Sequence, residues 1–474
     1  MCITAAAILL GGSLGTGCTV GPEYVRPEIA APERFRFATE EAHDLANTPW
    51  WHQFGDPVLN ELITTALADN LDVRIAAARV EEFYGALGSA RAGFFPQVGA
   101  EAAVGTGRTP PSAAADSVRV DAFVSWELDL FGRLRRLTEA GRADLLASEE
   151  GRRFAVLTLV SAVASTYISL RTVDAQLEIS RRTVKSREGA LKIFEARFKR
   201  GATGEIPLAQ SRAEYAIALS TVPPLEQAQA QIENALSVLI GRNPGPILRG
   251  KPLEELTLPG IPEGLPSEIL ERRPDIRQSE LNLISANARI GAVKAQYYPN
   301  ISLTGLFGSA SNAFDTLFTG PAELYSYGAG IVGPLFTGGG IAGQVRAAEA
   351  RHQQVLLAYQ SAIRNAFREV EDALIAGQKT REGLAAQSER VEAMRDYARL
   401  ANLRYDNGYS DYLEVLDAER GLFSAELDYT RVKSDTYFAL VDLYKSMGGG
   451  WVIDAAAAAS QPRVDVTKDP KPFP

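Results

Sequence analysis

Alternating apolar and polar side chains over residues 118–130 form the clearest pattern in the chain. Even-numbered positions there are apolar and odd-numbered positions are polar, with Phe123 as the exception. A period of two residues is typical of a β-strand with one apolar and one polar face. The alternation recurs over residues 97–105 and, less regularly, over 300–308 and 325–336. The sequence therefore predicts four strands in two hairpins.

The lengths of these strands suit a membrane, because a membrane-spanning β-strand needs about 9–11 residues. Trp126, Tyr325 and Tyr327 suit the aromatic girdle where a barrel meets the membrane surface. Two soluble hairpins with one half-buried face would give the same pattern. We favour membrane strands, because each hairpin lies between helices that are too long for an ordinary α+β core.

Two very long helices are predicted over residues 133–199 and 341–406, and each would span roughly 100 Å. An apolar residue recurs every seven positions at Leu177, Val184, Leu191 and Phe198. Adding 207 to these numbers gives Leu384, Val391, Ala398 and Tyr405. A seven-residue period predicts helices packed side by side. A plain two-stranded coiled coil stays open on this pattern alone.

The repeated stripe belongs to an internal duplication, which also shows in short motifs. Asp72-Val73-Arg74 recurs as Asp275-Ile276-Arg277, at an offset of 203 residues. We therefore place a first repeat at 56–242, a linker at 243–265, a second repeat at 266–449 and a tail at 450–474. Each repeat begins with a predicted helix, at 58–93 or 267–296, that ends at a proline.

One uncharged stretch resembles a transmembrane helix, but its length and its hydroxyl groups argue against that assignment. Residues 154–170 carry no charge, but their length is at the short limit for spanning a membrane. A stripe of hydroxyl groups follows helical spacing at Thr158, Ser161, Ser165 and Ser169. We therefore expect a packed helix with one wet face.

The amino terminus resembles a lipoprotein signal peptide. An apolar stretch is followed by Gly15-Thr16-Gly17-Cys18, and in such signals the cysteine becomes the lipidated first residue. We expect a signal peptide at 1–17, fatty-acid attachment to Cys18 and an extended tether at 18–55. Two features depart from the pattern: no Lys or Arg precedes the stretch, and Gly15 stands where Leu is usual. A plain cleaved signal with an incidental cysteine is the alternative.

Composition excludes several functions. The chain has 49 Lys and Arg against 58 Asp and Glu, a net charge of −9, which argues against a nucleic-acid partner. No cysteine follows Cys18, so neither a disulfide framework nor a thiolate metal site is expected. Gly338-Gly339-Gly340 lacks the Lys-Ser/Thr of a nucleotide-binding loop. We predict no catalytic, cofactor or metal site and no enzyme activity, so that energy for transport comes from a partner.

Four strands cannot close a barrel, since known single-chain barrels begin at eight. Open strand edges do not occur in lipid, because their backbone groups would lack hydrogen-bond partners. The strands must therefore close with copies from other chains. Eight strands from two chains would enclose a filled interior, so a conducting pore favours more copies.

The linker and its surroundings resemble the TolC-like outer-membrane factors, especially the lipoprotein branch that works with resistance-nodulation-division pumps. The residues that carry the resemblance are Cys18-Thr19-Val20-Gly21-Pro22-Glu23-Tyr24, Trp50-Trp51, Ile261-Pro262-Glu263-Gly264-Leu265-Pro266, Glu271-Arg272-Arg273-Pro274-Asp275-Ile276-Arg277 and Tyr412-Leu413-Glu414-Val415-Leu416-Asp417. They span about residues 18–450 in order. The resemblance implies an α+β membrane protein: a trimeric outer-membrane β-barrel with four strands per chain, continuing into a long periplasmic α-helical barrel.

The same resemblance implies partners and a function. The partners are two further copies of the chain, a periplasmic adaptor protein, an inner-membrane resistance-nodulation-division transporter and outer-membrane lipid. The function is the outer-membrane channel of a tripartite efflux pump, a passive exit duct for drugs or other toxic small molecules. The exit channel of a type I protein secretion system and a structural lipoprotein that bridges the envelope are the alternatives.

The turn of the second repeat holds a candidate periplasmic gate. Glu414, Asp417 and Arg420 lie three residues apart, nearly on one helix face, whereas their counterparts in the first repeat carry no charge. By the resemblance, Leu413 and Asp417 narrow the pore, while Arg420 and Tyr405 tie neighbouring helices. In a trimer, each acidic position would form a ring of three carboxylates. A solvated helix face is the alternative.

Overall fold

The computed structural model describes residues 19–29, 32–37, 49–108, 110, 115–260, 266–449, 451–452 and 455. Cys18, the predicted signal peptide and most of the predicted tail lie outside these residues. The chain divides into two compact units. We call Met1–Ile29, Ala78–Glu150 and Arg277–Ala362 the strand unit, and Ala30–Ala77, Gly151–Ile276 and Ile363–Pro474 the helical unit. Each unit combines segments of both predicted repeats.

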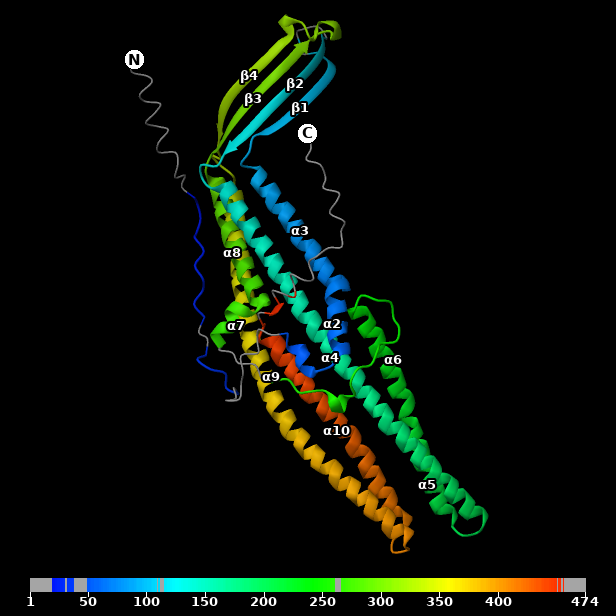
Figure 1. Ribbon diagram of the computed structural model, residues 1–474. Helices are drawn as coiled ribbons and strands as arrows, with labels where there is room; N and C mark the ends of the chain where they lie inside the picture. The colour runs from blue at the N-terminus through cyan, green and yellow to red at the C-terminus, as the bar shows by residue number, and fades with distance from the viewer. Residues whose placement is uncertain are drawn as a thin grey trace. The chain divides into compact units, whose positions relative to one another are not determined.

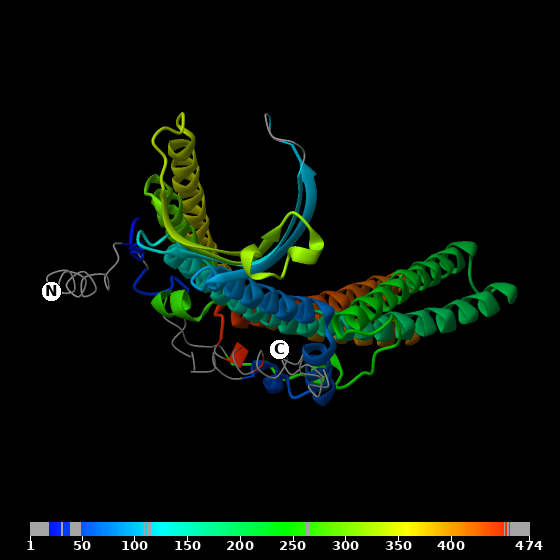
Figure 2. The same cartoon turned by 90° about the horizontal axis from the view of Figure 1, so that it is seen from above.

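The strand unit holds one antiparallel sheet, which curls along its length (Figures 1 and 2). Its strands follow chain order: β1 (Gln97–Gly107), β2 (Ala115–Leu128), β3 (Asn300–Ser311) and β4 (Glu323–Val332). The four predicted strands are thus present. The fourth ends earlier than predicted, since Leu335 and Phe336 lie beyond it and are fully exposed. Strands β1 and β4 are the two edges of the sheet.

Pairing across the strands explains why Phe123 breaks the alternation. Phe123 lies directly opposite Gly99 of β1, and a Cβ atom on Gly99 would be only 2.4 Å from its ring. The ring therefore covers the bare backbone of the glycine, an aromatic rescue known from other sheets. The opposite face of the sheet is apolar and open: Val98, Val104, Phe307, Tyr325, Tyr327 and Ile331 are all exposed.

The first helix of each repeat is broken, so the predicted single helices are wrong. In the first repeat, α2 (Pro57–Asp69) and α3 (Leu71–Ala92) meet at Asn70, whose backbone is extended. The Asn70 side chain accepts hydrogen bonds from the N–H groups of Asp72 and Val73, which caps α3. In the second, α7 (Pro266–Arg272) and α8 (Pro274–Lys294) are separated because Pro274 begins a new helix.

The two long helices agree with the sequence. Helix α4 covers Arg133–Lys199 as predicted, and α9 (Gly340–Asp406) begins one residue early. In the helical unit, α5 (Glu205–Ser220) and α6 (Val222–Leu239) lie along α4, and α10 (Tyr412–Ser446) lies along α9 (Figure 1).

The apolar core of the helical unit gathers around η1 (Trp50–Phe54). Trp50 stacks on Tyr444 at 5.2 Å, and Trp51 meets Trp451 edge-on at 4.9 Å between ring centroids. The start of the predicted tail therefore packs into the core. Apolar residues of the 154–170 stretch are buried in the same core, which agrees with a packed helix, although part of α4 is apolar enough to cross a membrane by composition.

A strap at residues 19–29 is held against the strand unit. The Val20 N–H donates to the carbonyl of Phe131, three residues after β2 ends. Arg26 forms an ion pair with Glu280 of α8 at 3.0 Å, and the Tyr24 hydroxyl donates to the same carboxylate. These contacts fix the chain just beyond Cys18 beside the end of a strand.

Candidate functional site

The candidate site lies in the helical unit, where each long helix turns back. The α4–α5 turn passes through Gly201 and the α9–α10 turn through Gly408, with φ of 69° and 76°. Both turns need a residue that tolerates the left-handed region, which explains why the glycine recurs in both repeats.

Two of the predicted gate residues contact the other repeat. The Tyr405 hydroxyl accepts a hydrogen bond of 2.6 Å from Nη1 of Arg197 on α4. Arg420 donates from Nε to Oε1 of Glu214 on α5, also at 2.6 Å. This hydrogen bond raises the pKa of the Arg420 guanidinium, which therefore stays charged. Both residues thus join helices of the two repeats within one chain.

The other predicted gate residues do not make such ties. Glu414 pairs with Arg404 of its own repeat at 2.9 Å. Asp417 accepts a long hydrogen bond of 3.5 Å from the Tyr397 hydroxyl. Leu413 is 57% exposed. The structure therefore separates Leu413, Glu414 and Asp417, which make no tie to the first repeat among the described residues, from the tying pair Tyr405 and Arg420.

Sequence reasoning missed the partners of the tying pair. Glu214 follows directly after Ala213, the uncharged counterpart of Arg420 in the duplication, so alignment alone hid it. Arg197 lies in the repeated Arg-aromatic motif, which was a usable signal. Neither contact is local in sequence, since both partners lie more than 200 residues away.

An aromatic cluster packs beside the ties. Tyr412 contacts Phe194 at 4.3 Å and Tyr405 at 5.3 Å between ring centroids. Burial raises the pKa of Tyr412, so its hydroxyl stays protonated near neutral pH. Tyr405 and Tyr412 also pack against a small buried core between α9 and α10, made by Ala398, Ala401, Val415 and Ala418.

The predicted heptad stripe on α4 is only partly buried. Leu177 is buried, whereas Phe198 at its other end is exposed. A second set with the same spacing is fully buried: Ser180, Arg187 and Phe194. Arg187 is an unusual residue for a helix interface, since arginine is seldom buried unless it is paired. Its partners are Glu214 and Glu419.

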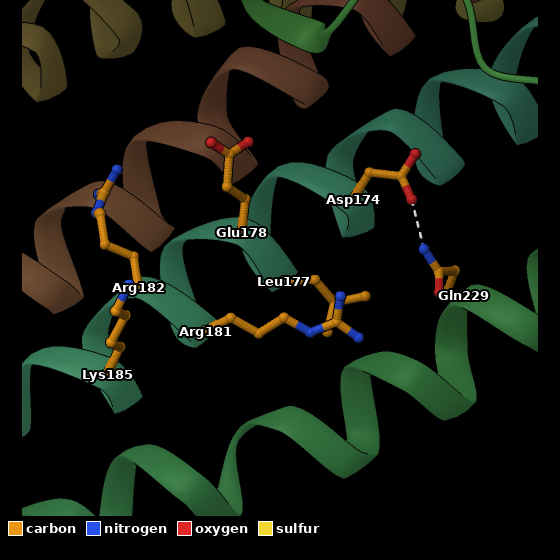
Figure 3. Close-up of a pocket in the computed structure, with 7 residues that line it drawn as sticks. All are labelled: Asp174, Leu177, Glu178, Arg181, Arg182, Lys185 and Gln229. Atoms are coloured by element: carbon orange, nitrogen blue, oxygen red, sulfur yellow. Dashed lines mark hydrogen bonds between the residues drawn. The ribbon is translucent and has the colours of Figure 1, made fainter. Parts of the chain in front are cut away.

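Farther along α4, charged side chains point to two different neighbours (Figure 3). Arg181 pairs with Glu226 of α6, within its own repeat, at 2.8 Å. Arg182 pairs with Glu426 of α10, in the other repeat, at 2.5 Å. Asp174 accepts hydrogen bonds from Gln229 of α6 and from Arg171 and Arg249. Helix α4 therefore joins its own hairpin and the second repeat at the same level.

A sheet with an open apolar face, together with long helix hairpins tied near their turns, defines a membrane-channel class of protein. The family model for outer membrane efflux proteins matches residues 62–242 and 265–449, and the chain belongs to this family. It is an outer-membrane efflux channel that extends into the periplasm. Among the residues described by the structure, no group of His, Cys, Asp or Glu is placed to hold a metal ion.

Individual relatives agree with this assignment. The solvent efflux pump outer membrane protein SrpC of Pseudomonas putida is 35% identical, over 94% of this chain and 97% of its own. The cation efflux system protein CusC of Escherichia coli is 33% identical, over 92% of this chain and 96% of its own. The open-state outer membrane channel MtrE of Neisseria gonorrhoeae superposes with a TM-score of 0.81 at 33% identity, covering 92% of this chain and 99% of MtrE. The family and these relatives are channel proteins rather than enzymes.

Proposed function

We propose that three copies of the chain close one twelve-stranded β-barrel in the outer membrane, which continues into a periplasmic α-helical barrel. The observation that carries this proposal is the four-stranded sheet with an open apolar face and two edge strands, β1 and β4. Edge strands in lipid would leave backbone groups without hydrogen bonds, so β1 and β4 must pair with other copies. Two copies would give eight strands and a filled interior, which disfavours a dimer.

The trimer acts as the passive exit duct of a tripartite efflux pump. A resistance-nodulation-division transporter in the inner membrane supplies the energy, and a periplasmic adaptor joins it to the duct. The cargo is drugs or other toxic small molecules, in keeping with the efflux names of the relatives. The channel needs no cofactor and catalyses no reaction.

The tip of this duct is a gate, defined here as the α4–α5 and α9–α10 turns and the helix ends beside them. Leu413 and Asp417 narrow the pore, and Glu414 adds a second acidic ring that Arg404 partly neutralises. Tyr405 and Arg420 hold the closed state through Arg197 and Glu214. Opening separates these partners, which is the condition for a tie to favour the closed state.

Purified protein in planar bilayers tests the duct. We expect ion-conducting channels, and a mass in detergent that corresponds to three chains. A structural lipoprotein that merely bridges the envelope would give no conductance. A stable monomer with an intact β signal in circular dichroism would refute the shared barrel, because its edge strands would then be tolerated without partners.

Lipid attachment at Cys18 is a further part of the proposal. The strap holds Val20, two positions after the cysteine in sequence, beside the end of β2. We expect Cys18→Ser to abolish labelling by palmitate and to leave an uncleaved or mislocalised precursor. Barrel insertion need not be lost, because the strands do not depend on the anchor. Wild-type protein that takes up no label would show that the cysteine is incidental.

A further inference from the structure

Arg187 of α4 carries a buried charge near the gate. The ties made by Tyr405 and Arg420 do not explain why this charge is there. Its side chain is 4% exposed. Its Nη1 lies 2.7 Å from Oε2 of Glu419 on α10, and its Nη2 lies 3.9 Å from Oε2 of Glu214 on α5. A guanidinium in this position is unfavourable unless carboxylates compensate it, so the arrangement needs a reason.

The four charges form two crossed pairs between the repeats. Arg187 and Glu214 come from the first repeat, whereas Glu419 and Arg420 are neighbours on α10 of the second. Arg187 pairs with Glu419, and Arg420 binds Glu214. Two of the three nitrogens of the Arg420 guanidinium, Nε and Nη2, donate to Oε1 of Glu214, and Oε2 of Glu214 is the oxygen nearer to Arg187. The two charges of the first repeat are therefore already near each other.

Arg187 also has donor capacity to spare. Its Nη1 is buried and makes no hydrogen bond of good geometry to any part of the chain that the structure describes, despite the close carboxylate of Glu419. The other terminal nitrogen, Nη2, lies 3.9 Å from Oε2 of Glu214, which is beyond hydrogen-bond distance but leaves the two charges as neighbours.

The duplication supplies an internal comparison for this helix crossing. Adding 207 to Arg187 and Glu214 gives Met394 on α9 and Gly421 on α10. There the methionine lies directly over the glycine, since a Cβ on Gly421 would be 2.9 Å from Sδ of Met394. The second repeat thus makes the equivalent crossing with an apolar contact. Packing of the hairpin does not require the charges found in the first repeat.

We propose that Arg187 and Glu214 form an exchange pair, meaning two residues that bind α10 in the closed gate and bind each other when it opens. This inference rests on the proposed function, because it assumes that α10 moves away from α4 and α5. Glu419 and Arg420 would leave together with α10 and become hydrated. Arg187 and Glu214 would then neutralise each other, so opening leaves neither charge unpaired. The pair stabilises the open state and makes the gate two-state rather than permanently shut.

Two variants that delete the same closed-state tie separate this idea from a simple latch. Arg420→Ala removes the tie and leaves the exchange pair intact for the open state. Glu214→Ala removes the tie and the exchange pair together. In single-channel recordings we expect Arg420→Ala to raise the open probability at least about threefold more than Glu214→Ala does. Equal open probabilities would overturn the exchange pair and leave the latch in place.

A matched background keeps the test independent of folding. The double variant Arg187→Met with Glu214→Gly copies the Met394–Gly421 contact, so it keeps the packing without the charges. Adding Arg420→Ala to this background should change the open probability by less than about twofold. A larger change would show that Arg420 acts without Glu214 and would overturn the exchange. If the channels conduct but their open probability is the same in all of these variants, the proposal of a gate at this tip is wrong. If neither the wild type nor any variant conducts, the proposal of a conducting duct is wrong.

Discussion

Arg420→Ala is expected to open the tip of the channel. The Arg420 side chain is 54% exposed, so its ion pair with Glu214 is screened and each tie contributes about 0.2–1 kcal/mol. Three symmetric ties would favour the closed state by roughly 0.6–3 kcal/mol. Their loss should raise the open population severalfold to about a hundredfold. Adding Tyr405→Phe weakens the contact with Arg197 and should increase the effect.

Open probability and conductance in planar bilayers measure this result, and cells carrying the variant should become sensitive to large antibiotics that are normally excluded. Arg212→Ala is the matched control. Arg212 is an exposed arginine on the same α5 helix as Glu214, and its ion pair, with Glu195, stays within the first repeat. If Arg212→Ala raises the open probability as much as Arg420→Ala does, the ties between the repeats do not stabilise the closed state.

Features of the fold that follow from a local sequence pattern could be predicted, whereas features that depend on tertiary contacts could not. The limits of α4 followed from sequence because a helix of this length carries its own heptad pattern and ends near a glycine. The break at Asn70 was missed because its cap is a local hydrogen-bonding choice of one side chain, which a single-sequence pattern does not report. Pro274 was a usable signal, since a proline inside a helical pattern ends the helix before it.

The residues of the candidate site also differ in whether a local sequence pattern or a tertiary contact reveals them. Glu414, Asp417 and Arg420 could be chosen because they lie nearly on one helix face, and the resemblance to the family added Tyr405 and Leu413. Arg187 and Glu214 could not, since their importance comes from helices that meet only after folding. The duplication held a usable hint: an arginine in one repeat stands where the other has Met394, which marks a contact that packing alone does not explain.

Asp417→Ala is expected to weaken the preference of the pore for cations. A ring of carboxylates selects cations, and in a trimer Asp417 would supply three. Its contact with the Tyr397 hydroxyl is long and uncharged, and Arg420, three positions along α10, interacts with its charge but binds Glu214. The ratio of cation to anion permeability should fall by about twofold or more toward one. Reversal potentials in a salt gradient measure this ratio.

Two comparisons sharpen that measurement. Glu414→Gln should change selectivity less than Asp417→Ala, because Arg404 already lies 2.9 Å from Glu414 and offsets its charge. Gln210→Ala, at the counterpart of Asp417 in the first repeat, should have little effect because no charge is removed. The difference between wild type and Asp417→Ala should shrink in 1 M salt, where the screening length falls to about 3 Å. If Gln210→Ala and Asp417→Ala change selectivity equally, the acidic residues of the second repeat are a solvated helix face and not a ring around the pore.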